Sequence, residues 1–208
     1  MRTPIRLAIA LTVGLTSAGC VIHAVPMETR ALPERNPTVH SFEMPLEELR
    51  TRVMAGLTRT AQRDEPIFGP NESNGGPVTF EVREVGEHSS WLEVMKLPGN
   101  ERDLYLDADH DPLWESPIYR GPRAGLPFLA DFRVHLAESG PSRTSVSVAA
   151  LETEVLNGST WGIGSCGPGT FNRYVRVEPT SVEEYVILRR IGAILGVASM
   201  PDVILPAR

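Results

Sequence analysis

The feature that most constrains the fold is an alternating pattern on either side of residues 138–142. Alternate positions of the first segment carry apolar side chains, namely Phe128, Ala130, Phe132, Val134 and Leu136. Gly140 and Pro141 then predict a turn. The alternation resumes at 144–148 with Val146 and Val148. Because successive side chains of a strand point to opposite faces, this pattern predicts an antiparallel hairpin with one face on a core.

Two other segments have the period of an α-helix. Pro45 suits a first helical turn, and the apolar residues that follow predict a helix from Pro45 to about Thr60. Thr180 and Glu183 form a capping-box pattern before a second, longer helix that Pro201 ends. The apolar stripe of that helix consists of Ile187, Leu188, Ile191, Ile194, Leu195 and Ala198.

The rest of the chain predicts short strands and loops. Strands are expected at 39–43, 78–83, 90–97, 103–107 and 173–177, and Gly- and Pro-rich loops at 63–76, 111–127 and 157–169. The predicted fold class is therefore α+β: an antiparallel sheet with an N-terminal helix and a long C-terminal helix. The alternative is an open two-layer α/β sandwich with both helices on one face of the sheet.

The N-terminus has the charge order of a secretory signal peptide. Arg2 and Arg6 precede an apolar run over 7–15, which is about half the roughly 20 residues that span a bilayer. Small residues follow and lead into a cysteine, in the sequence Leu15-Thr16-Ser17-Ala18-Gly19-Cys20. This order indicates export and cleavage.

With a cysteine at the cleavage point, the segment resembles the signal and lipobox of bacterial lipoproteins. The resemblance implies that residues 1–19 are removed and that Cys20 carries diacylglycerol and a further acyl chain such as palmitate. Several chains together give stable membrane anchoring. Val21 in place of an aspartate implies the outer membrane of a two-membrane bacterium, facing the periplasm or the exterior. The alternative is an ordinary signal peptide cut near Ala18 or Ala24.

The expected organisation is a signal peptide at 1–19, a lipidated cysteine with a flexible tether at 20–38, one α+β domain at 39–200 and a tail at 201–208. The domain resembles the START-like helix-grip domains, which bind lipids and polyketides. These domains also open with a strand, a proline and a helix, here Phe42-Glu43-Met44-Pro45-Leu46, and close with a long helix across a curved sheet.

The charge and the cysteine count exclude some functions. The chain has a net charge of −6, and the loss of Arg2 and Arg6 with the signal leaves −8. An acidic surface argues against binding nucleic acid. If Cys20 carries lipid, Cys166 has no disulfide partner within the chain. Cys166 is then a small buried apolar residue, a reactive thiol or a cysteine that pairs with another molecule.

Three patterns resemble functional motifs, but each is explained better without a functional site. Gly162-Ile163-Gly164-Ser165-Cys166-Gly167 has the letters of a dinucleotide fingerprint, but no helix is predicted after it. Asp107, Asp109 and Asp111 start like a calcium loop, yet Pro112 and Ile118 stand where an EF-hand needs glycine and glutamate. His135, Asp131 and Arg133 share one strand face, as any solvent-facing strand predicts. We therefore expect no cofactor, no metal and no catalytic residue.

The leading hypothesis is a lipid-anchored cell-envelope lipoprotein, not an enzyme, that binds a partner protein or an apolar small molecule. One alternative is an envelope enzyme that uses Cys166 in its glycine-rich loop. Another is a structural or assembly lipoprotein without a ligand. An apolar cavity beside the C-terminal helix favours the first hypothesis, a histidine beside Cys166 the second, and a filled core with an exposed apolar patch the third.

Overall fold

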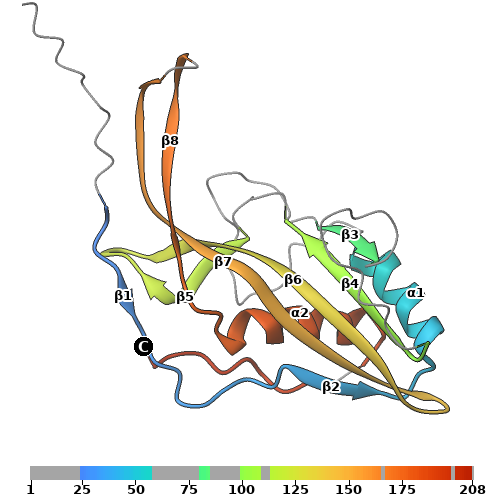
Figure 1. The fold of residues 1–208 in the computed structure, drawn as a ribbon. Helices are drawn as coiled ribbons and strands as arrows, with labels where there is room; N and C mark the ends of the chain where they lie inside the picture. Colours follow the sequence, from blue (N-terminus) through green and yellow to red (C-terminus); the bar gives the residue numbers. More distant parts are fainter. Residues whose placement is uncertain are drawn as a thin grey trace, which may run out of the picture.

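The structure is a computed structural model that describes residues 24–57, 80–84, 99–108, 113–164, 167–197 and 200–207. These residues form an eight-stranded antiparallel sheet and two helices, which confirms the α+β class (Figure 1). The elements are β1 (Glu28–Thr29), β2 (Val39–Phe42), α1 (Leu46–Leu57), β3 (Glu81–Glu84), β4 (Glu101–Asp107), β5 (Trp114–Arg120), β6 (Gly125–Gly140), β7 (Arg143–Gly164), β8 (Gly167–Arg176) and α2 (Ser181–Ile194).

The predicted hairpin is the centre of the sheet. Strands β6 and β7 pair antiparallel from Phe128↔Val155 to Gly140↔Arg143. Every apolar residue of the predicted inward face of β6 is buried, as are Val146 and Val148 of β7. The period-2 pattern therefore predicted the correct face of both strands, because one buried face fixes the alternation.

Both β6 and β7 are long enough for two different strands to pair, one after the other, along the outer edge of each. The outer edge of β6 pairs with β5 near the start of the strand and with β4 near its end. The outer edge of β7 pairs with β2 near the start and with β8 near the end. Beyond the last β6 pair, the ends of β7 and β8 pair with each other and project from the body (Figure 1).

The predicted loop over 157–169 is wrong, because β7 runs to Gly164 and β8 begins at Gly167. The glycines suggested a loop, but β-favouring residues lie between them and pair across the strands, as Thr160↔Phe171 and Trp161↔Thr170 do. Gly158 has a φ of 159° and lies where the register shifts, between Leu156 and Ser159. The pairing of β7 with β8 is therefore irregular at Gly158 and continues on both sides of it.

The predicted loop over 111–127 is also wrong, because it contains β5 and the start of β6. Pro117 had argued against a strand, but it lies between Glu115 and Arg120, where the β5–β6 register shifts. A Cβ on Gly125 would lie 2.3 Å from the Ser116 backbone oxygen. Glycine at this position allows the two backbones to approach, which a sequence pattern does not reveal.

The two helices contribute to the same core as the inner face of the sheet. The four apolar residues of α1 at helical spacing, Leu46, Leu49, Val53 and Leu57, are all buried. Thr180 is the N-cap of α2, and its side chain accepts from the Val182 N–H. The prediction that α2 continues to Pro201 is wrong: α2 ends at Ile194, and Gly196 has a φ of +77°, a common way to end a helix.

The described parts of the predicted tether and tail are attached to the domain instead of extending from it. β1 pairs with β5, and Asn36 is only 3% exposed. The Asn36 side chain donates to the Ile204 carbonyl at 3.0 Å and accepts from the Ile204 N–H at 2.7 Å. Asn36 N–H also donates to the Ser181 hydroxyl at 2.8 Å. The side chain of Asn36 thus joins the segment before β2 to the C-terminal segment, and its backbone joins the same segment to the first residue of α2. The Pro-rich composition of the segment does not indicate this role.

The structure confirms some of the remaining predicted strands, and others lie partly or wholly outside the described residues. The strand expected at 39–43 is β2, and that at 103–107 is β4, which begins two residues earlier. Only the end of the strand expected at 78–83 falls on described residues, as β3. The strand expected at 90–97 lies outside the described residues.

Candidate functional site

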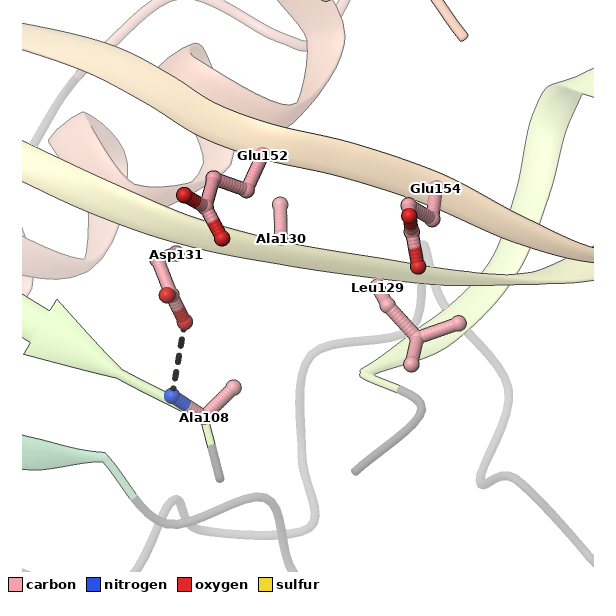
Figure 2. Close-up of a pocket in the computed structure, with 6 residues that line it drawn as sticks. All are labelled: Ala108, Leu129, Ala130, Asp131, Glu152 and Glu154. Atoms are coloured by element: carbon pink, nitrogen blue, oxygen red, sulfur yellow. Dashed lines mark hydrogen bonds between the residues drawn. The ribbon is translucent and has the colours of Figure 1, made fainter. Parts of the chain in front are cut away.

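A small acidic pocket lies where β6 and β7 change register (Figure 2). Its volume is about 50 Å³, which is room for one or two water molecules. The lining residues are Ala108, Leu129, Ala130, Asp131, Glu152 and Glu154. None of them belongs to α2, so this pocket is not the apolar cavity beside the C-terminal helix that the leading hypothesis considered.

A β-bulge forms this pocket. Leu129 pairs with Glu154 and Asp131 pairs with Leu151, so β7 has one residue more than β6 between these pairs. Glu152 lies within this insertion at a φ of +47°, which is uncommon for a side-chain-bearing residue. Figure 2 shows the Glu152 carboxylate turned toward Asp131. The bulge therefore gathers acidic side chains that regular pairing would spread along the strand.

Asp131 is held in place by the neighbouring strand. Its Oδ1 accepts from the Ala108 N–H at 3.1 Å, and its Oδ2 accepts a short hydrogen bond from the Tyr105 hydroxyl. Burial, and then the bond to Asp131, raise the pKa of Tyr105. Within the described ranges, no group of three or more His, Cys, Asp and Glu residues is arranged to hold a metal ion. The contacts of Asp131 are those of a carboxylate that ties β4 to β6.

The set of His135, Asp131 and Arg133 does not assemble as the strand-face pattern suggested. His135 Nδ1 lies 2.7 Å from Asp103 Oδ1, and its Nε2 lies 3.9 Å from Glu101 Oε2. Both carboxylates belong to β4, and Asp103 is the direct cross-strand partner of His135. Directly opposite residues are about 5 Å apart, whereas next neighbours on one face of a strand are nearly 7 Å apart. The sequence identified His135 but not its partners, because the register of β4 on β6 is not encoded locally.

Two adjacent glutamates at the start of α2 are buried. Glu183 is 0% exposed, and burial raises the pKa of its carboxyl to about 7. Burial also raises the pKa of Glu184, whose Oε1 accepts weakly from the Ala150 N–H at 3.5 Å. Glu183 Oε2 bonds to the Thr180 hydroxyl, while Glu183 Oε1 and Glu184 Oε2 have no hydrogen-bond partner among the described residues. These contacts anchor the start of the helix. The charge of Arg35 lowers the pKa of Glu184 but does not offset the larger effect of burial.

The sequence interpretation assigned Glu183 only to a helix cap. A signal of its burial was present, since Glu183 precedes Ile187 by four residues and Glu184 precedes Leu188 by four. Residues four apart lie on one helix face, and both of these apolar residues are buried. The two glutamates therefore lie on the buried face of α2, one turn before Ile187 and Leu188.

The other residues singled out in the sequence divide between described and undescribed parts of the chain. Cys20, Cys166, Asp109 and Asp111 lie outside the described residues. Asp107 ends β4, and its Oδ2 lies 3.9 Å from an Arg83 guanidinium nitrogen. The backbone of Gly162 to Gly164 pairs with that of Gly167 to Gly169. This segment is thus strand on both sides and lacks the strand-to-helix turn that a dinucleotide site needs.

Comparison of the chain with models of protein families, with curated proteins and with solved structures finds no match. Among the described residues, no helix has the length and apolar character needed to cross a membrane.

Proposed function

We propose that this protein is a lipid-anchored lipoprotein of the cell envelope that acts by binding a partner protein at its surface and catalyses no reaction. The anchor is the lipid on Cys20, and the membrane is the outer membrane of a two-membrane bacterium. The observation that carries the proposal is the basic, apolar and small-residue order of residues 2–19, directly before Cys20. The segment after Ala24 pairs with strands of the domain. This supports the proposal, because a lipid on Cys20 would then hold the domain close to the bilayer.

The core of the domain supports surface binding over an internal apolar ligand. The α2 face that the helix-grip resemblance would use for a ligand is fully buried at Tyr185, Leu188 and Ile191. The Tyr185 hydroxyl donates to the Pro201 carbonyl at 2.8 Å, so the segment after α2 closes one side of the helix. The pocket between β6 and β7 has room for water only, and three of its six lining residues are carboxylates. A partner would therefore meet the exterior of the domain.

We also propose a helix-grip arrangement, in which the curved antiparallel sheet holds α2. The contact of Glu184 with the Ala150 N–H of β7 supports it, as does the course of α2 along the β6–β7 ribbon (Figure 1). An experimental structure with α2 across an open, flat sheet would favour the two-layer sandwich instead.

The anchor is tested by mass spectrometry of the mature protein and by metabolic labelling with a palmitate analogue. We expect a mature N-terminus at Cys20 that carries diacylglycerol and an acyl chain, and recovery of the protein with the outer membrane. Cys20→Ala should abolish labelling and leave an uncleaved precursor. Cys166→Ala is the matched control, and it should be labelled and processed as the wild type is. A mature chain that begins beyond Cys20, or a free Cys20 thiol, would refute the proposal.

A further inference from the structure

The strand ends beyond the body of the sheet form a two-stranded arm, which we define as residues 157–164 of β7 and 167–173 of β8 (Figure 1). Trp161 pairs with Thr170 on one face of this arm, and Thr160 pairs with Phe171 on the other face. Trp161 is 70% exposed. A large aromatic side chain is thus presented to the surroundings at a position that packs against no core.

The arm differs in charge from the rest of the protein. The chain contains 26 acidic residues, yet none of them lies between Glu154 and Glu178. Arg173 is an exposed residue of the arm on the face opposite Trp161, whereas Arg176 lies outside the arm and pairs with Glu154. The arm therefore lacks the negative charges that would repel an anionic surface such as phospholipid headgroups.

The first described residues of the chain lie at the base of the arm. The Val25 N–H donates to the Asn157 carbonyl at 3.0 Å, and Asn157 is the first arm residue of β7. Cys20 is five residues before Val25. Five residues span at most about 17 Å, whereas the four residues from Asn157 to Trp161 rise about 13 Å. A lipid on Cys20 thus limits the bilayer surface to about 17 Å from the base of the arm, a distance comparable with the reach of Trp161.

We propose that the Trp161 face of the arm lies against the lipid surface that holds Cys20, with Trp161 at the membrane–water interface. Trp is enriched at this level of membranes because its ring is apolar and its N–H is polar. The arm fixes the orientation of the domain on the membrane, which the lipid alone leaves free to rotate. This inference rests on the proposed lipid anchor.

The test uses the full-length lipidated protein in vesicles that contain an anionic phospholipid, with or without brominated acyl chains that quench nearby tryptophans. We expect brominated lipid to lower the emission of the wild-type protein and to have a clearly smaller effect on Trp161→Phe. The variant Thr160→Trp in the Trp161→Phe background moves the tryptophan to the other face of the arm. Its quenching should be weaker than that of the wild type.

Thermal unfolding of each variant shows whether the fold is kept, and Trp161→Phe should unfold as the wild type does, since the side chain is exposed. Equal quenching of wild type and Trp161→Phe would overturn the inference, and so would a dimer held through the arm. If Cys20 then carries lipid by mass spectrometry, the anchor stands and only the orientation fails. An unmodified Cys20 overturns both.

Discussion

The burial of Glu183 makes the stability of the domain depend on pH in an unusual direction. The carboxyl is completely buried at the start of α2, and its pKa is raised from 4.5 to about 7. Below about pH 4.5 both the folded and the unfolded chain hold this proton, and Glu183 then causes no loss of stability. As the pH rises toward 7, the unfolded chain releases the proton first, so ionisation favours unfolding.

The size of the effect follows from the difference in pKa. A shift of one unit corresponds to about 1.4 kcal/mol, so a pKa of about 7 implies a loss of about 3 kcal/mol between pH 4.5 and pH 8. For a domain of this size, that loss lowers the melting temperature by roughly 6–12 °C. The pKa of Glu184 is raised as well, and its ionisation lowers stability in the same direction.

Thermal unfolding of the mature protein in mild detergent, followed by circular dichroism from pH 5 to pH 8, measures this dependence. Glu183→Gln cannot ionise, so we expect its melting temperature to fall much less than that of the wild type across this range. Glu138→Gln is the control, because Glu138 is exposed and its loss should leave the slope unchanged. If wild type and Glu183→Gln have the same slope, the carboxyl is not buried as the structure describes and the reasoning is refuted.

Two further predictions concern the packing of α2. Ile191 is completely buried, so Ile191→Ala should lower the free energy of unfolding by about 2–5 kcal/mol, and urea unfolding that shows a loss below about 1 kcal/mol would contradict the core. A Cβ on Gly56 would lie 2.6 Å from Ile194 Cγ2, so Gly56→Ala should destabilise by about 1–3 kcal/mol despite the helix propensity of alanine. Gly99→Ala is its control, since nothing lies within 4 Å of the added methyl, and similar melting curves for the two variants would contradict close helix packing.

Local periodicity was sufficient to predict the elements whose buried face is continuous. Two patterns identified residues that are buried in the core: the alternation from Phe128 to Leu136, and the helical spacing of Leu46, Leu49 and Val53. Such patterns are readable because one buried face imposes a period of 2 on a strand and of 3.6 on a helix. Where glycine and proline interrupt the pattern, as in β5 and in the arm, the prediction was wrong because pairing with a neighbouring strand overrides local preference.

The candidate sites depended on contacts between segments far apart in the chain. His135 was noticed as a residue of one strand face, but its carboxylate partners come from β4, 32 or more residues earlier. Asp131 likewise binds Tyr105 and Ala108, not the neighbours on its own strand. The bulge that turns Glu152 toward Asp131 has no signal in the sequence, since a single extra residue in one strand is defined only by its partner.

The sequence by itself determined the inward faces of the central hairpin and the two helices, the N-cap at Thr180 and the acidic balance of the chain. These properties depend on residue type and on spacing over one or two turns. The tertiary structure decided the register of β4 on β6, the burial of Glu183 and Glu184 and the projection of Trp161. The hydrogen bonds between Asn36 and Ile204 and between Val25 and Asn157 were likewise decided by the tertiary structure. Each of these depends on which distant backbone lies alongside, and that is fixed by the packing of the whole chain.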